Sequence, residues 1–107
     1  DNVKLMNAYP ERIGYLHLKQ VHPDILAETL KNDLPFVEAV AKGVMTEPGA
    51  SGVPDFAPII EKALSIDPDM FAIVEQDMYG CDVDFPFPIA KRTKDHIASC
   101  TRAARFK

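Results

Sequence analysis

Hydrophobic and polar residues alternate along two short segments of the chain, and apolar residues follow a helical period in most of the rest. The alternating segments are Ile13–Val21 and Met70–Asp77. Successive side chains of a strand point to opposite faces, so each segment presents two distinct faces. The first is apolar on both faces until its end, which is typical of a parallel strand covered on both sides. The pattern therefore predicts two strands, at about 13–21 and 70–77.

Helical spacing of apolar residues predicts helices before, between and after these strands. The expected helices are Val3–Tyr9, Asp24–Leu30, Pro35–Ala41, Phe56–Ser65 and a last one that begins at Pro88. Pro23 or Asp24 should start the second helix, Gly43 should stop the third, and Asp55 should cap the fourth. Residues 43–54 are rich in Gly, Pro and Ser, which predicts a loop of functional length.

Strands that alternate with helices imply parallel pairing and an α/β fold. Two parallel strands alone would leave two unpaired edges, which is a marginal arrangement in water. A closed eight-stranded barrel takes roughly 250 residues, so this chain could supply only about a quarter of its strands. Because the chain begins with Asp1 and has no initiator Met, we expect an amino-terminal part to precede it.

Composition narrows the class of protein. With 107 residues, of which 47% are hydrophobic and 26% are charged, the chain fits one soluble globular domain. The net charge is -4 and basic residues cluster only near the carboxyl end, which argues against a nucleic-acid partner. No segment resembles a membrane span or a signal peptide, so we expect a cytoplasmic protein. Cys81 and Cys100 are expected to be free thiols.

Polar side chains near the carboxyl ends of both expected strands are the candidates for chemistry, because active sites of α/β sheets lie at that edge. His17 and Glu75 are expected metal ligands, since imidazole and carboxylate suit divalent ions such as Zn, Mn, Co and Fe. Lys19 could bind a substrate oxygen or stabilise an enolate. Asp77 and Gln76 could orient these groups from behind.

Each of these residues also has an interpretation without chemistry. His17 could be a hydrogen-bonded core residue, Glu75 could form a salt bridge with Lys19, and Lys19 could be a solvated residue at a strand end. His22 and His96 are expected at the surface. The chain contains no P-loop, dinucleotide fingerprint, serine nucleophile elbow or Cys-x-x-Cys site.

Several short motifs in order carry a resemblance to a known family. They are HLK at His17–Lys19, PF-x-x-AV-x-x-G at Pro35–Gly43, Asp55-Phe56 after the Gly-rich loop, and VEQD at Val74–Asp77. With these motifs the chain resembles the xylose isomerase-like barrel superfamily, in particular the sugar phosphate isomerase/epimerase group and the inosose (2-keto-myo-inositol) dehydratases. The loop departs from the usual G-x-G-x-V-D-F pattern, because Pro54 precedes Asp55.

The resemblance implies a (β/α)8 TIM barrel, of which residues 1–107 would be the carboxyl-terminal portion of a single domain. It implies a divalent ion (Mn, Co, Mg or Zn) held by a Glu, an Asp, a His and a second Glu from four strands. By motif position His17 is the histidine ligand and Glu75 the final glutamate, which can also act as an acid or base. Lys19 matches a residue that faces the substrate in dehydratase-like members.

The leading hypothesis is a metal-dependent sugar (phosphate) or cyclitol isomerase/epimerase, with Glu75 and Lys19 as catalytic residues and a proton moved beside a metal-bound carbonyl or hydroxyl. The alternative is an inosose dehydratase-type lyase. A hypothesis of another class is a non-catalytic α/β fragment or interaction module that lacks half of the metal site. Copies could also associate through the open sheet edges. The isolated 107 residues are expected to be inactive.

Overall fold

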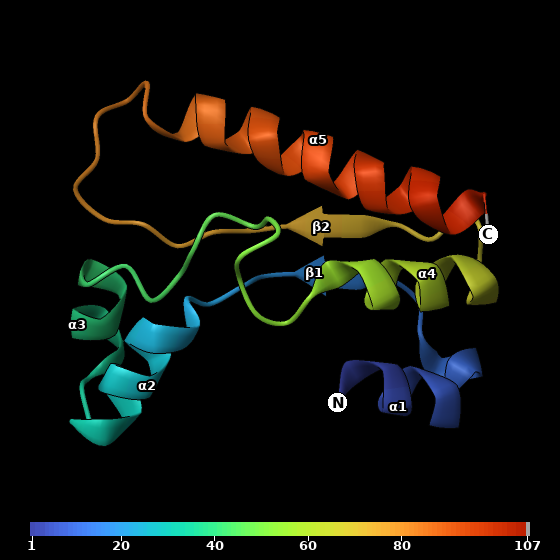
Figure 1. Ribbon diagram of the computed structural model, residues 1–107, viewed down its shortest axis with the longest axis horizontal. Helices are drawn as coiled ribbons and strands as arrows, with labels where there is room; N and C mark the ends of the chain where they lie inside the picture. The colour runs from blue at the N-terminus through green and yellow to red at the C-terminus, as the bar shows by residue number, and fades with distance from the viewer. Residues whose placement is uncertain (107) are drawn as a thin grey trace.

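The computed structural model describes residues 1–106, which form a two-stranded parallel sheet with α-helices around it (Figure 1). The elements in chain order are α1 (Asn2–Ala8), the 3-10 helix η1 (Pro10–Arg12), β1 (Leu16–Leu18), α2 (Pro23–Lys31), α3 (Phe36–Ala41), α4 (Phe56–Ile66), β2 (Ala72–Val74) and α5 (Pro86–Arg105). The mixed α/β class and the parallel pairing of the two predicted strands are confirmed.

The helix boundaries follow from local chemistry at their ends. Asp55 caps α4 as predicted, because its side chain accepts a hydrogen bond from the Ala57 amide at 3.0 Å. α2 begins at Pro23, the first of the two predicted starts. Gly43 follows α3 with a φ of 88°, a conformation that glycine adopts without steric cost.

The last helix begins two residues before the predicted start at Pro88. Its first residue is Pro86. The first amides of a helix have no carbonyl partner inside the helix, so a proline there loses no hydrogen bond. Both prolines are therefore compatible with the first turn, and the earlier one starts α5.

The two strands are shorter than the predicted segments 13–21 and 70–77, because each covers only three residues. A strand lasts only as long as its partner runs beside it. Past the end of β1 the chain turns to another partner, and Val21 forms isolated antiparallel bridges with Met45 and Val53. The position of the first extended segment was therefore predicted correctly. This segment pairs with β2 over Leu16–Leu18 and with the Gly-rich loop at Val21.

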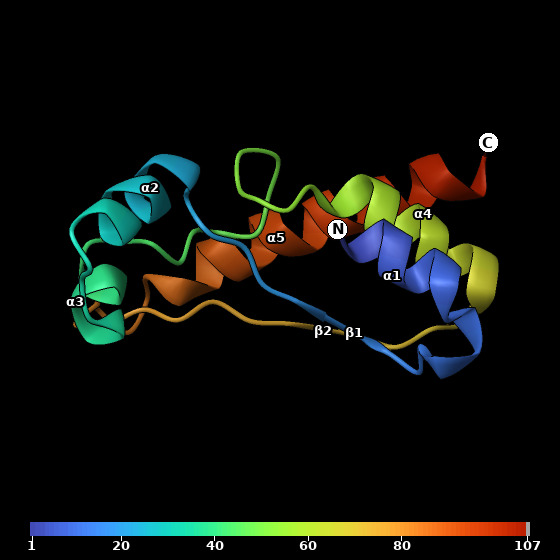
Figure 2. The ribbon, with the colours of Figure 1, turned by 90° about the horizontal axis from the view of Figure 1, so that it is seen from below.

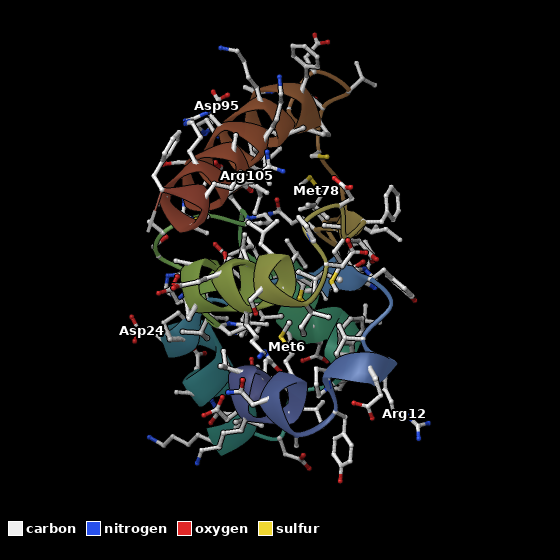
Figure 3. All side chains as sticks on the ribbon, turned by 90° about the vertical axis from the view of Figure 1, so that its right-hand side faces the viewer. Met6, Arg12, Asp24, Met78, Asp95 and Arg105 are labelled. Carbon is white, nitrogen blue, oxygen red and sulfur yellow. The ribbon has the colours of Figure 1, made fainter. Side chains whose placement is uncertain are left out.

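Helices α1, α4 and α5 all lie on one side of the sheet (Figure 2). Between them is the main core, in which Phe56 is 1% exposed. The other buried members of this core are Met6, Leu18, Ile59, Ile60, Ala63 and Cys100. Figure 3 shows Met6 between α1 and α4. The apolar stripe predicted for 56–65 thus covers one face of the sheet, as expected for an amphipathic helix.

The other face of the sheet is bare, which differs from the prediction that the first strand is covered on both sides. Tyr15 is 59% exposed, Phe71 67% and Ile73 43%. Figure 2 shows no described element on this side of the two strands. The apolar residues on this face indicate a surface suited to burial, since a parallel sheet is normally covered on both faces.

A smaller core joins α2 and α3, which lie beyond the carboxyl ends of the strands (Figure 1). Its buried members are Ala39, Val40 and Val44. The prediction of free thiols is confirmed, because Cys81 is exposed, Cys100 is buried, and neither forms a disulfide. Within residues 1–106, no helix combines the length and the apolar character that crossing a membrane requires.

Candidate functional site

Four of the predicted side chains come together near the carboxyl ends of β1 and β2. The strands end side by side, and the Glu75 amide continues the pairing with a 3.1 Å hydrogen bond to the Leu18 carbonyl oxygen. Two extended segments carry these residues at alternate positions, His17 and Lys19 on the first and Glu75 and Asp77 on the second, so the strand repeat predicts that they share a face. The contacts below agree with that placement.

Glu75 is the centre of this cluster. Its Oε2 lies 2.8 Å from His17 Nε2, and its Oε1 accepts a hydrogen bond from Lys19 Nζ at 2.8 Å. The same ammonium lies 2.9 Å from Asp77 Oδ2. Among the alternatives left open by the sequence, the salt bridge between Glu75 and Lys19 is confirmed. The core interpretation of His17 is wrong, because 48% of its side chain is exposed.

The charges of the cluster stabilise one another. Hydrogen bonds from Lys19 and, secondly, from His17 hold the pKa of the Glu75 carboxyl below its usual value of 4.5. Hydrogen bonds to Glu75 and then Asp77 raise the pKa of Lys19 above 10.5. At neutral pH the carboxylate and the ammonium are therefore both charged. A carboxylate in this state can bind a cation or accept a proton.

We expect the pKa of Glu75 in the metal-free chain to lie below 4.5 and to rise toward that value in Lys19→Met, because the variant removes the strongest donor to the carboxylate. Carbon-13 NMR of the Glu75 side-chain carboxyl against pH measures this directly. Lys42→Met is the matched control, since Lys42 pairs with Glu28 at 3.0 Å, outside the cluster. An unchanged Glu75 pKa in Lys19→Met would contradict the expectation.

The same shifts set the pH range over which the cluster stabilises the fold. A lowered carboxyl pKa means that the Glu75 contribution is present above 4.5 and is lost as the pH falls through the folded-state value. A raised ammonium pKa means that the Lys19 contribution is present below 10.5 and is lost as the pH rises through the folded-state value. The effect is small because the groups are partly solvated.

Gln76 lies apart from the cluster, unlike Asp77. Its Nε2 donates to the Met45 carbonyl oxygen at 3.4 Å, and its Oε1 is buried with no partner among residues 1–106. His22 and His96 are both half-buried rather than exposed at the surface. His96 Nε2 lies 3.7 Å from the Cys100 Sγ.

The sequence interpretation missed Gln20, which organises the Gly-rich loop. Gln20 is 1% exposed. Its Nε2 donates to the carbonyl oxygens of Pro54 at 2.7 Å and Gly52 at 3.3 Å, and its Oε1 accepts from the Gly49 amide at 2.7 Å. A Cβ at Gly52 would lie 2.7 Å from that Oε1. A polar residue among the apolar positions of the strand was the only sequence signal for this role.

A second connection between the loop and the rest of the molecule was also missed. Arg92 of α5 binds Glu47 with two hydrogen bonds of 2.8 Å, from Nε to Oε1 and from Nη2 to Oε2. This two-bond geometry lowers the pKa of Glu47 and raises that of Arg92. The loop is therefore attached to Gln20, which contacts it from Thr46 to Pro54, and to α5 through Glu47.

His17 and Glu75 fit the two ligand positions that the resemblance assigns to them in a four-ligand metal site. Two ligand atoms on one ion are roughly 3 Å apart when each ligand bond is about 2.1 Å, and His17 Nε2 lies 2.8 Å from Glu75 Oε2. An imidazole with a carboxylate is a donor set that suits divalent transition metals. Within residues 1–106, no group of three or more His, Cys, Asp or Glu side chains is arranged to hold an ion.

Comparisons with known proteins find relatives named inosose dehydratase and one named for rhizopine catabolism. No protein-family model and no solved structure matches it. The inosose dehydratase of Geobacillus kaustophilus is 38% identical over 91% of this chain, and that of Glaesserella parasuis is 38% identical over 87%. The rhizopine catabolism protein MocC of Rhizobium meliloti is 32% identical over 100% of this chain.

The chain spans about a third of the length of these relatives: 31%, 30% and 32% respectively. The two that are named for a reaction are dehydratases, so the comparisons favour the dehydratase alternative over the isomerase or epimerase hypothesis. The chain is therefore homologous to part of the inosose dehydratases, which confirms the resemblance seen in its sequence.

Proposed function

We propose that this chain is part of a longer lyase that removes water from inosose or a similar cyclitol ketone. The observation that carries the proposal is the convergence of His17, Glu75 and Lys19 at one edge of the sheet, with contacts of 2.8 Å. The homology to inosose dehydratases supports it independently. The isomerase or epimerase reaction is the less supported variant of the same chemistry.

The longer protein would be a (β/α)8 barrel, and the surfaces that the sheet leaves uncovered support this. A groove of about 510 Å³ lies between α5 and the segment that includes Val74 and Gln76. Thr93, 6% exposed, lines this groove, and its hydroxyl has no partner among residues 1–106. Buried polar groups are normally hydrogen-bonded. A further strand beside β2 would cover the groove and supply backbone partners.

The outer edge of β1 borders a second groove. It has a volume of about 290 Å³ and lies between β1, α1 and α4. The two grooves leave apolar surface where the neighbouring elements of a barrel would pack. The bare sheet face that includes Tyr15 and Phe71 leaves apolar surface where the barrel interior would be. These surfaces support a closed barrel in which the sheet face that carries His17 points toward the barrel interior.

In the proposed reaction His17 and Glu75 would supply two ligands of a divalent ion, which polarises a carbonyl and an adjacent hydroxyl when it is bound. Lys19 would bind the substrate's carbonyl oxygen, where its positive charge stabilises the enolate that forms when the neighbouring carbon loses a proton. The carboxylate of Glu75 would accept or return a proton. Elimination balances when the proton that Glu75 takes from carbon is delivered to the leaving hydroxyl, which departs as water.

The test is an assay of the complete polypeptide encoded by the gene, supplied with Mn²⁺ and inosose, with loss of one water from the substrate detected by mass spectrometry. We expect water loss from inosose and no epimerisation of ketohexoses. Epimerisation without water loss would favour the isomerase variant. Inactivity toward both substrates would overturn the proposal. It would favour the non-catalytic module, a hypothesis that also agrees with two, rather than four, expected metal ligands within residues 1–106.

A further inference from the structure

Lys19 is shared between two carboxylates that make different contacts in the cluster. Its Nζ lies 2.8 Å from Glu75 Oε1 and 2.9 Å from Asp77 Oδ2. Glu75 also receives His17 on its other oxygen. The Asp77 side chain is 29% exposed, compared with 43% for Glu75. The Lys19 ammonium therefore contacts Glu75, which is a proposed cation ligand, and Asp77, which is not, at almost the same distance.

A divalent ion and this ammonium would compete for Glu75. Each positive charge is attracted to the carboxylate and repelled by the other, and the repulsion is strong at separations of a few ångström. An ion bound by His17 and Glu75 would therefore push the ammonium away from Glu75 Oε1. A lysine side chain has four carbons between its ammonium and the backbone, so the ammonium can move without moving the backbone.

We propose that Asp77 is a positioning residue that takes over Lys19 when a divalent cation binds at His17 and Glu75. Asp77 keeps the ammonium at the site, where it can meet a substrate oxygen, and frees Glu75 for the cation. Asp77 is two residues beyond Glu75 and on the same side as Lys19, so the transfer needs only a rotation of the lysine side chain. This inference rests on the proposed function, because it requires the cation.

The test is binding of Mn²⁺, without substrate, to the complete polypeptide, measured by isothermal titration calorimetry. In Asp77→Asn the ammonium stays on Glu75, so we expect Mn²⁺ to bind about tenfold more weakly. Lys19→Met removes the competitor, so we expect binding about fivefold tighter. In the double variant the Asp77 substitution should change the affinity by less than about twofold relative to Lys19→Met, since there is no ammonium to hold.

Two further variants separate this role from a general effect of charge. Asp77→Glu keeps a carboxylate beside Lys19 and should retain most of the wild-type affinity. Asp84→Asn removes the same charge from an exposed position in the segment before α5 and should leave the affinity unchanged. Circular dichroism and a urea midpoint for each variant verify that it is folded.

The outcomes distinguish this inference from the proposed function. An equal loss of affinity from Asp77→Asn in the wild-type and Lys19→Met backgrounds would show that Asp77 acts on the cation directly, and would overturn the inference. Unchanged affinity in Asp77→Asn would also overturn it, while wild-type Mn²⁺ binding and water loss from inosose would leave the proposed function intact. Absence of Mn²⁺ binding by the wild-type protein would overturn both.

Discussion

Glu75→Gln is expected to reduce kcat for water loss from inosose by about a thousandfold or more, because one substitution removes both the proposed cation ligand and the proposed proton acceptor. The amide has almost the same shape as the carboxylate and can still accept a hydrogen bond from Lys19. The variant should therefore keep the fold and lose the chemistry. The measurement is steady-state kinetics of the complete polypeptide, with Mn²⁺ binding measured in parallel.

Glu47→Gln is the matched control for that experiment. Glu47 is also a carboxylate with a lowered pKa, but its partner is Arg92 and it lies outside the cluster. We expect kcat of this variant to stay within about threefold of the wild type, since the exposed pair contributes little. If Glu75→Gln were no more impaired than Glu47→Gln, Glu75 would have no part in the reaction.

Phe56→Ala is expected to have the largest effect on stability, with a loss of about 3–5 kcal/mol in the free energy of unfolding. Phe56 is 1% exposed and belongs to the main core. Its removal would leave a cavity among side chains that contact it from several elements. Small domains are stable by only about 5–15 kcal/mol, so the variant should unfold at much lower urea concentration.

Phe36→Ala is the control, because Phe36 and Phe56 are each the first residue of their helix, α3 and α4. Phe36 is 56% exposed. The same substitution there should cost less than about 1 kcal/mol. Urea unfolding followed by circular dichroism measures both variants. Equal losses would mean that helix starts, rather than burial, determine the effect, and would contradict the core described above.

The helices of this chain could be predicted because their signals are local. The stripe of α4 and its Asp55 cap depend on residues within one or two turns of each other. The lengths of β1 and β2 could not be predicted in the same way, because a ladder depends on how long a distant partner stays alongside. The bare sheet face also depends on what lies outside the chain, which no local pattern reports.

In the candidate site, too, some features could be predicted from the sequence and others could not. The common side of His17 and Glu75 followed from strand alternation once the two strands were paired. The division of the Lys19 ammonium between two carboxylates depends on a side-chain rotamer, and several rotamers are compatible with the sequence. The contact of Arg92 with Glu47 joins residues 45 positions apart. Only the folded chain brings such pairs together.

Gln20 connects the shape of the Gly-rich loop to the chemistry of the cluster. It directly follows Lys19, and it is held by hydrogen bonds from and to the loop at Gly49 and Pro54. Adjacent residues of an extended chain share one backbone, so a loop of different length would pull on Gln20 and turn Lys19 with it. A loop of different length would therefore shift the ammonium, whose described ion pairs are with Glu75 and Asp77 and not with the loop.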